Sequence, residues 1–416
     1  MFKQLSKEQK TILLVLSLIN FFNYVDRQVV FSLLHLIKQE FGSTDFQLGL
    51  LGTVFMLVHS IASLPLGILA DRFSRKAVIV FGAIFWSLTS FATGLATSFK
   101  ALLGIRSAVG IGEASYAPAA TAMISDNFPA NLRAQAQGAF NVGMFAGGTI
   151  GLMLGGLLAY YFHSWRLAFF IVSIPGFILA VLTLKLKDRK VIHPGGGKNW
   201  SVLFKNPAYV WLLVGGIFST FASGAWISWG IEFVVRYKNY NLRDASMILG
   251  VILLVAGIIG VYLGSFLADW LQKKFIWGRS MAVSASHLLA VPFVWLVLEK
   301  WSSGIWFFLF FFIGAAFWSF YHGPATAVMH DIVPKKLWST AFALYILIIH
   351  LLGDTLAPAA IGRLSDRYSL LWGMRFTILM IFISGLAFVV MGEIIRRRKI
   401  NLNHEEAALV LTEEVL

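Results

Sequence analysis

The sequence predicts an all-α membrane protein with twelve transmembrane helices in two six-helix bundles. Its 416 residues are 58% hydrophobic and only 13% charged, with a mean hydropathy of +0.76, whereas soluble domains carry about 25% charged residues. The apolar residues gather in stretches of about 20, the length that crosses a bilayer as a helix. Two short motifs from the first half of the chain also recur in the second half. These observations together predict a duplicated membrane bundle.

The apolar stretches and the charged breaks between them define the expected helices. The first bundle, residues 1–187, contains the stretches near 11–37, 46–70, 77–98, 101–125, 134–161 and 166–187. A polar linker is expected at 188–205 because it contains charged residues and three consecutive glycines. The second bundle, residues 206–397, contains the stretches near 207–235, 243–271, 279–298, 303–329, 338–362 and 371–395, and a polar tail follows at 398–416.

The net charge of +14 is explained by membrane topology, and we expect no nucleic-acid partner. The Lys and Arg residues concentrate in alternate gaps between apolar stretches, including the N-terminal segment, the linker and the segment after the last stretch. By the positive-inside rule, both termini and the linker should face the cytoplasm of a cell whose inner membrane holds the protein. The chain opens without a pattern typical of a cleaved signal, so the first helix should be retained.

The residue types argue against an enzyme. The chain has no cysteine, which excludes disulfides, thiolate chemistry and cysteine-based metal sites. It also lacks a zinc-binding histidine–glutamate signature and a glycine-rich phosphate loop. We therefore expect no catalytic residues, no metal and no cofactor, in a protein that acts as a monomer among membrane lipids.

The recurring motifs lie at matching places in the two halves. Leu69–Lys76 follows the second stretch and is echoed without a gap by Leu267–Lys274 after the eighth. Ala120–Pro129 at the end of the fourth stretch is echoed by Ala325–Pro334 after the tenth. Two echoes in the same order indicate duplication of a six-helix unit.

The first motif combines an acid with clustered bases at a helix end, which could latch neighbouring helices in one conformation. A simple topology signal would explain the bases, but it would not explain why the acid is repeated. The residues expected to form this latch are Gly67, Asp71, Arg72, Arg75 and the echoed acid Asp269.

Charged residues also occur inside two apolar stretches. Arg106 and Glu113 are two turns apart in the fourth stretch and share one helix face. In the first stretch, Asn23 and Arg27 lie on one stripe at helical spacing with Asp26 at its edge. A charge near the centre of a membrane helix costs about 2.5–3.5 kcal/mol on insertion scales, so such residues are expected to be paired and functional. Either a structural ion-pair network or a proton relay with a site for an anionic headgroup would satisfy these residues.

These segments resemble the spinster family of lysolipid transporters within the major facilitator superfamily. The resemblance rests on Asn23–Arg27, the segment Gly67–Lys76, Gly110–Tyr116 and Trp165–Arg166. It implies the major facilitator fold and proton-linked movement of lysophospholipids or sphingoid phosphates. By position, the first-helix acid and base of the family correspond to Asp26 and Arg27, and the fourth-helix pair to Arg106 and Glu113.

On this interpretation, Asp26 and Glu113 carry the coupling proton. The headgroup would contact polar side chains in the first half, while the tail would lie against aromatic side chains in the second half. The residues expected to bind substrate are Asn23, Tyr24, Arg27, Arg106, Tyr116, Trp226, Trp318, Tyr321 and His322. For His322 a structural hydrogen-bonding role is the alternative.

Two other functions stay open. A carrier of a small organic anion or sugar acid would use Arg27 and Arg106 equally well. A lipid scramblase or a membrane enzyme is the further alternative, and a scramblase would move lipid without any gradient.

Overall fold

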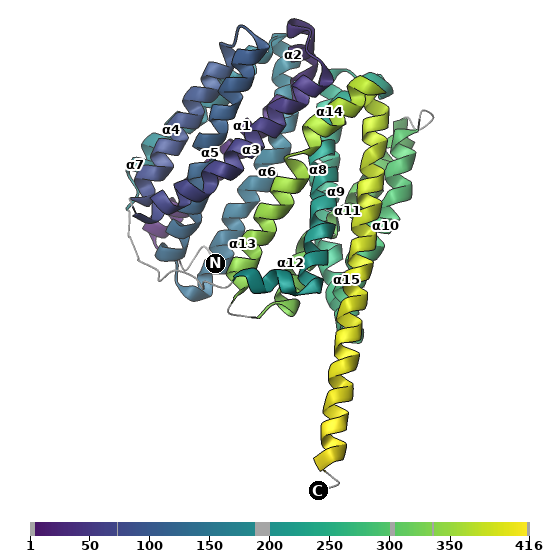
Figure 1. The fold of residues 1–416 in the computed structure, drawn as a ribbon. Helices are drawn as coiled ribbons and strands as arrows, with labels where there is room; N and C mark the ends of the chain where they lie inside the picture. Colours follow the sequence, from purple (N-terminus) through teal and green to yellow (C-terminus); the bar gives the residue numbers. More distant parts are fainter. Residues whose placement is uncertain (1–4, 73, 188–199, 300–303, 335–336, 414–416) are drawn as a thin grey trace. The chain divides into compact units, whose positions relative to one another are not determined.

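The computed structural model describes residues 5–413 except 73, 188–199, 300–303 and 335–336 (Figure 1). All of the regular secondary structure in this part of the chain is helical. The predicted all-α class is therefore confirmed.

The helices before the linker begin and end close to the predicted stretches, and one short helix was not predicted. The first stretch breaks after Ser32, and α2 then runs to Gly42, which ends the helix in a left-handed conformation with φ of 59°. The helices are α1 (Lys7–Ser32), α2 (Leu34–Phe41), α3 (Asp45–Arg72), α4 (Arg75–Gly94), α5 (Phe99–Asn127), α6 (Ala130–Phe162) and α7 (Trp165–Leu184).

Two of the later apolar stretches are interrupted helices. One is divided between α11 and α12, and the other is divided between α13 and α14 by a π-helical segment. The elements are η2 (Trp200–Lys205), α8 (Pro207–Lys238), α9 (Leu242–Lys274), α10 (Gly278–Leu298), α11 (Gly304–Ser319), α12 (His322–Ile332), α13 (Trp338–Ile349), η4 (His350–Asp354), α14 (Ala357–Arg367) and α15 (Leu370–Glu413).

Eleven helical segments in the described ranges are long and apolar enough to cross a membrane. The remaining predicted span is α5, which has 29 residues but carries Arg106 and Glu113 among many small side chains. Its lower hydropathy follows from those charges, so α5 needs polar partners from neighbouring helices. The twelve expected spans are thus all present as helical segments.

The chain groups into two compact units, and most of the boundaries between them lie outside the predicted linker. Unit 1 comprises Met1–Pro194, Gly224–Leu254 and Thr355–Met374. Unit 2 comprises Gly195–Ser223, Val255–Asp354 and Arg375–Leu416. The boundaries fall inside α8, α9 and α15, so the two six-helix halves stay a prediction.

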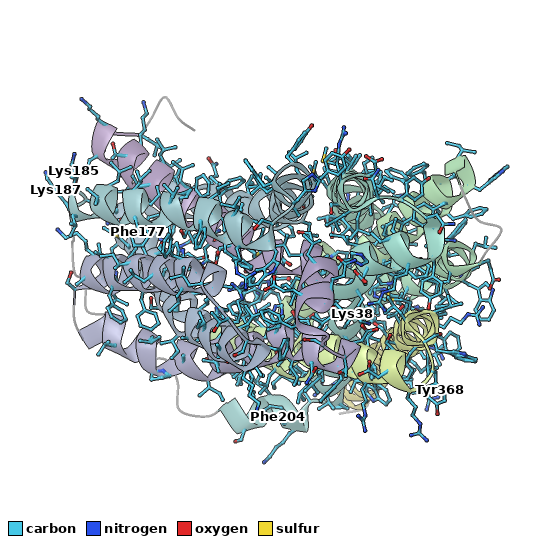
Figure 2. The ribbon with its side chains drawn as sticks, turned by 90° about the horizontal axis from the view of Figure 1, so that it is seen from above. Lys38, Phe177, Lys185, Lys187, Phe204 and Tyr368 are labelled. Atoms are coloured by element: carbon cyan, nitrogen blue, oxygen red, sulfur yellow. The ribbon has the colours of Figure 1, made fainter. Side chains whose placement is uncertain are left out.

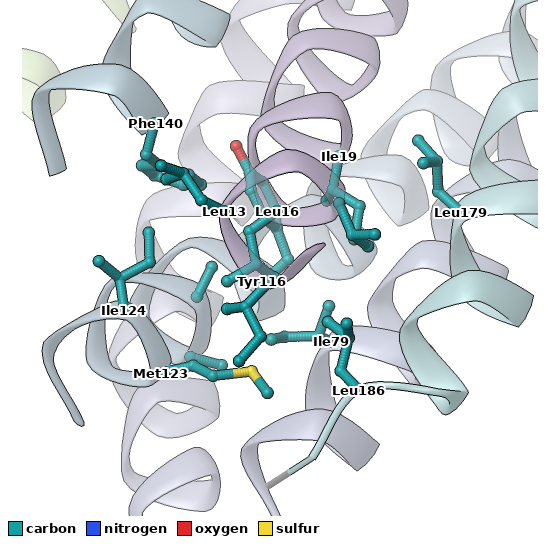
Figure 3. Close-up of a cluster of buried hydrophobic side chains, with 14 of the residues drawn as sticks. Leu13, Leu16, Ile19, Ile79, Tyr116, Met123, Ile124, Phe140, Leu179 and Leu186 are labelled. Carbon is teal, nitrogen blue, oxygen red and sulfur yellow. The ribbon is translucent and has the colours of Figure 1, made fainter. Parts of the chain in front are cut away.

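Unit 1 has an apolar core formed by α1, α3, α4, α5, α6 and α7. Figure 3 shows side chains of this core, among them Leu16 of α1, Ile79 of α4 and Met123 of α5. Phe140 of α6 and Leu179 of α7 complete the contact from the other sides. A separate core in unit 2 surrounds Tyr209, Val283, Met329 and Phe388.

Within unit 1, a stripe of glycines on α6 contacts the backbone of α1. A Cβ atom added at Gly147 would lie 2.2 Å from the carbonyl oxygen of Phe21, and one at Gly151 would lie 2.7 Å from that of Val25. Gly143 meets the Ser17 carbonyl in the same way, at 2.7 Å. Small residues at this spacing permit the close approach of membrane helices. These glycines therefore pack α6 tightly against α1 and fix the position of α1.

Candidate functional site

The charged residues of the first and fourth predicted spans meet inside unit 1. Arg27 of α1 donates from Nε to Oε2 of Glu113 on α5, at 3.0 Å. Arg106 Nη1 lies 3.7 Å from Oδ2 of Asp26. Glu113 and Asp26 are fully buried, and Arg106 is 1% exposed. Two helices thus supply two acids and two bases to one buried network.

Arg27 has several partners besides Glu113. Its Nη2 lies 3.1 Å from Nε2 of His59 on α3. Its guanidinium also lies over the ring of Tyr24, 4.6 Å from the centroid, and 5.2 Å from that of Phe55. A guanidinium over an aromatic face is stabilised by the ring quadrupole. The expected neighbour Tyr24 therefore contacts the network, and His59 joins it as a residue that sequence reasoning missed.

Asp26 and Arg106 are enclosed by α4 and by aromatic rings. Ser90 of α4 donates from Oγ to Oδ2 of Asp26, at 2.5 Å. The guanidinium of Arg106 lies 5.4 Å from the ring centroid of Phe55 and 5.6 Å from that of Phe169. Ser90 and Phe169 were not predicted, because a lone serine or phenylalanine in an apolar helix carries no signal in one sequence.

The network retains unused hydrogen-bonding capacity among the described residues. Oδ1 of Asp26, Oε1 of Glu113, and Nε and Nη1 of Arg106 are buried without a hydrogen-bond partner. The same holds for both polar atoms of the Asn23 side chain, which is fully buried. Buried polar groups are normally satisfied by protein or by ordered water. This part of unit 1 can therefore accept water, a proton or a polar group of a ligand.

Tyr116 lies in the apolar core next to the network. Its hydroxyl donates to Oδ1 of Asn20, whose Nδ2 donates to the carbonyl oxygen of Phe140 at 2.7 Å. The ring packs edge-on against Trp86, with centroids 5.7 Å apart. Its predicted role in substrate binding stays a prediction, and Asn20 is its hydrogen-bond partner.

The predicted aromatic residues are distributed over both units. Trp226 of unit 1 is 1% exposed and packs edge-on against Phe233. In unit 2, Trp318 donates from Nε1 to Oγ of Ser219 at 3.1 Å. Tyr321 bonds through its hydroxyl to Tyr345, whereas the side chain of His322 is exposed. Contact with a substrate tail stays a prediction for these residues.

The predicted latch contains an ion pair in unit 1. Arg75 at the start of α4 pairs with Asp126 at the end of α5, and both side chains are almost fully buried. Gly67 lies near Pro118, to which an added Cβ would come within 3.7 Å. The side chains of the other two members, Asp71 and Arg72, lie outside the described residues.

Unit 2 contains the corresponding arrangement. Arg279 at the start of α10 donates from Nη2 to Asp269 at 2.8 Å and from Nη1 to Asp331 at 2.6 Å. Asp126 and Asp331 hold the same place in the second recurring motif. The two motifs therefore meet through an arginine in each unit, and this pairing of motifs was not predicted.

Comparison with known proteins places the chain among membrane transporters. The sequence model of the Major Facilitator Superfamily matches residues 16–358. Protein spinster of Drosophila melanogaster is 30% identical over 373 residues, which is 85% of this chain. The chain spans 61% of that protein's length. Protein spinster homolog 1 of Xenopus laevis is 30% identical over 389 residues, covering 87% of this chain and 74% of the relative.

Solved structures support the same assignment of the fold. The crystal structure of a bacterial homolog to the human lysosomal transporter Spinster, inward-facing and unoccupied, matches with a TM-score of 0.83. Its sequence identity is 24%, and the match covers 94% of this chain and 98% of that one. A D-xylose–proton symporter matches with a TM-score of 0.74 at 14% identity, covering 94% of this chain and 97% of that one. The chain is therefore a multi-pass membrane transporter that belongs to the Major Facilitator Superfamily and, within it, to the spinster family.

Proposed function

We propose that the protein moves an amphipathic lipid with an anionic or zwitterionic headgroup, of the lysophospholipid or sphingoid-phosphate type, by proton-coupled alternating access. The observation that carries this proposal is the buried network of Arg27, Glu113, Asp26 and Arg106. Its formal charges sum to zero, and several of its polar atoms have no hydrogen-bond partner among the described residues.

The coupling follows from competition for the two arginines. A phosphate group that binds Arg27 or Arg106 must take donors that now serve Glu113 or Asp26. A buried carboxylate that loses its cationic partner is stabilised by binding a proton. Headgroup binding and proton binding therefore favour each other, and release of either favours release of the other. The resemblance of Asn23–Arg27 and Gly110–Tyr116 to the spinster family of lysolipid transporters supports this choice of substrate class.

The proposed topology uses the distribution of charge in the sequence. Lys and Arg concentrate on the side of the chain's termini, which supports cytoplasmic termini in a cell inner membrane. On this basis α2 faces the opposite side of the membrane, because it follows directly after the first span. The Arg75–Asp126 pair and the contacts of Arg279 would then act as latches on the cytoplasmic side.

The first test measures uptake of a labelled lysophospholipid into proteoliposomes, with and without an inward proton gradient. We expect gradient-dependent uptake for the wild type and loss of that dependence for Glu113→Gln, while binding of the lipid is retained. Glu40→Gln is the matched control, because Glu40 pairs with Arg166 away from the network. Unchanged gradient dependence in Glu113→Gln would remove the proton-coupling mechanism, and gradient-independent movement would indicate a scramblase.

A small organic anion is the second candidate substrate, because Arg106 Nε is a buried donor with no hydrogen-bond acceptor among the described residues, and it would suit any carboxylate or phosphate. Competition separates the two candidates. Lysolipids of increasing tail length should compete increasingly well if the protein carries a lipid. Competition by small acids alone, with no effect of tail length, would identify a small-anion carrier.

A further inference from the structure

A second group of charged side chains lies in unit 1 at the end where α1 is followed by α2. We call it the α2 cluster and define it as His35, Lys38, Asp45, Glu232, Arg236, Ser365 and Asp366. Figure 1 shows α2 at one end of α1, and Figure 2 labels Lys38 in the view from that end. The cluster shares no residue with the buried network described above.

Asp45, the first residue of α3, is the centre of the cluster. Arg236 of α8 donates to both of its carboxylate oxygens, at 2.7 and 2.9 Å. Lys38 and Ser365 each donate to it at 2.5 Å. Asp366 of α14 accepts from the backbone N–H of Asp45 at 2.8 Å. A bidentate arginine–carboxylate pair is a strong and directional contact, so the cluster ties together segments of unit 1 that are far apart in sequence.

His35 connects to this arrangement through Glu232. Its Nδ1 lies 3.2 Å from Oε1 of Glu232, the same oxygen that accepts from Nε of Arg236 at 2.6 Å. Nε2 of His35 lies 3.0 Å from Nε2 of Gln39. The His35 side chain is 33% exposed, and it lines a cavity of about 350 Å³ together with Gln39, Tyr160, His163 and Asn241. A proton from solvent can therefore reach His35 without passing the buried network.

The charges around His35 favour its protonated form. From α8 it faces Glu232, with Arg236 behind that carboxylate, and from its own helix it faces Lys38. The hydrogen bond with Glu232 raises the pKa of His35 above its ordinary value, against the opposing effects of burial and of the two cations. Across the cavity the only other titratable wall residues in the described chain are Tyr160 and His163. A protonated His35 would help Arg236 to hold the Glu232 carboxylate.

We propose that the α2 cluster is a pH-sensitive gate in which protonated His35 holds α2, α3, α8 and α14 together on the side of the membrane opposite to the termini. The need for such a gate to open rests on the proposed alternating-access function. Its titrating group is distinct from Asp26 and Glu113, so proton coupling and gating can be tested separately.

The sign of the pH effect follows from linkage. The closed gate binds the His35 proton more tightly than the open gate, because opening removes Glu232 from the imidazole. Low pH therefore favours the closed gate, and closure weakens as the pH rises through the raised pKa of His35. Each unit of difference between the pKa values in the two states changes the open-to-closed ratio about tenfold.

The test uses the absence of native cysteines. Spin labels are attached to Thr97→Cys and Tyr368→Cys, two exposed positions of unit 1 outside the cluster. Their distance distribution is measured by pulsed electron resonance in lipid nanodiscs at about pH 6 and about pH 8, on either side of the ordinary histidine range. We expect a longer-distance population that grows at the higher pH in the wild-type background.

Four variants decide the outcome. His35→Gln should make the distance distribution independent of pH. Glu232→Gln should have the same effect, and it replaces His35→Gln if that variant folds poorly. The control His163→Asn, in the same cavity wall, should keep the pH effect. Glu113→Gln should also keep it, even though transport loses its proton dependence. Three outcomes would overturn the proposal. The distance distribution of the wild type could be independent of pH, the pH effect could survive in both His35→Gln and Glu232→Gln, or it could be lost in Glu113→Gln.

Discussion

Neutralising Glu113 should destabilise the protein, and removing Arg27 at the same time should restore most of that stability. The two side chains form a buried ion pair at 3.0 Å, with Glu113 fully buried and Arg27 9% exposed. In Glu113→Gln the guanidinium keeps its charge but loses its anionic partner. Breaking a buried pair by removing one partner typically costs about 3–5 kcal/mol.

The structure indicates a smaller net cost here. Arg27 keeps His59 at 3.1 Å and the Tyr24 ring at 4.6 Å, and a partly desolvated cation–π contact contributes about 0.5–2 kcal/mol. We therefore expect Glu113→Gln to lose about 1–3 kcal/mol. The double variant Arg27→Leu with Glu113→Leu removes both charges. It should lie within about 1 kcal/mol of the wild type, or above it, because apolar replacement of a buried pair is often neutral or stabilising.

The measurement is unfolding of the purified protein in mixed micelles containing increasing SDS, followed by intrinsic tryptophan fluorescence, for the wild type, Glu113→Gln, Arg27→Leu and the double variant. Arg27→Leu alone should be the least stable form, since it leaves the Glu113 carboxylate fully buried without its cation. The reasoning is refuted if Glu113→Gln is as stable as the wild type, or if the double variant is less stable than both single variants.

Three further predictions concern other contacts of the fold. Arg75→Met should lower the free energy of unfolding by about 3–5 kcal/mol because its ion pair is almost fully buried. Arg279→Met should lower it by less than about 1 kcal/mol per pair because its partners are 40% and 60% exposed. Equal losses in thermal unfolding would contradict this. Gly147→Val should destabilise the protein by at least about 1–3 kcal/mol through overpacking against α1. The control Gly104→Ala should be neutral or stabilising, because a Cβ added at Gly104 has no neighbouring atom within 4 Å. The opposite order of thermal midpoints would disprove the close contact of α6 with α1. Arg166 lowers the pKa of Glu40 through a hydrogen bond. The stability lost in Arg166→Gln should therefore be largest near neutral pH, and the loss should vanish as the pH falls through that lowered pKa. A loss of stability that is independent of pH would exclude the ion pair as its source.

The apolar pattern predicted the membrane fold because hydropathy reports directly on burial in lipid. It failed to predict local backbone breaks. The first span ends at Ser32, and α2 continues as a separate short helix, although the residues on both sides are apolar. The π-helical segment His350–Asp354 also lies inside the predicted stretch 338–362. Such breaks depend on contacts with neighbouring helices, which periodicity along one helix does not contain.

The candidate site, too, was predicted only in part from the sequence. Asp26, Arg27, Arg106 and Glu113 were conspicuous because a charge in a membrane helix requires a partner, and the four do meet. The sequence could not indicate which acid pairs with which base, since adjacent residues in α1 point to different neighbours. The partners His59 and Ser90, and most of the α2 cluster, come from segments far away in the chain. Their residue types are common at helix ends and in apolar helices, so tertiary packing alone identifies them.

The glycine stripe of α6 has a consequence for the charged side of α1. Because Gly147 and Gly151 contact the carbonyl groups of Phe21 and Val25 directly, α1 cannot turn about its own axis without a steric clash. The contact therefore fixes the rotation of α1 about its axis, and this sets the direction in which the side chains of Asp26 and Arg27 leave the helix. A substitution in α6 that never touches a charged residue should misdirect both, so the chemistry of the network depends on a surface that has no functional groups at all.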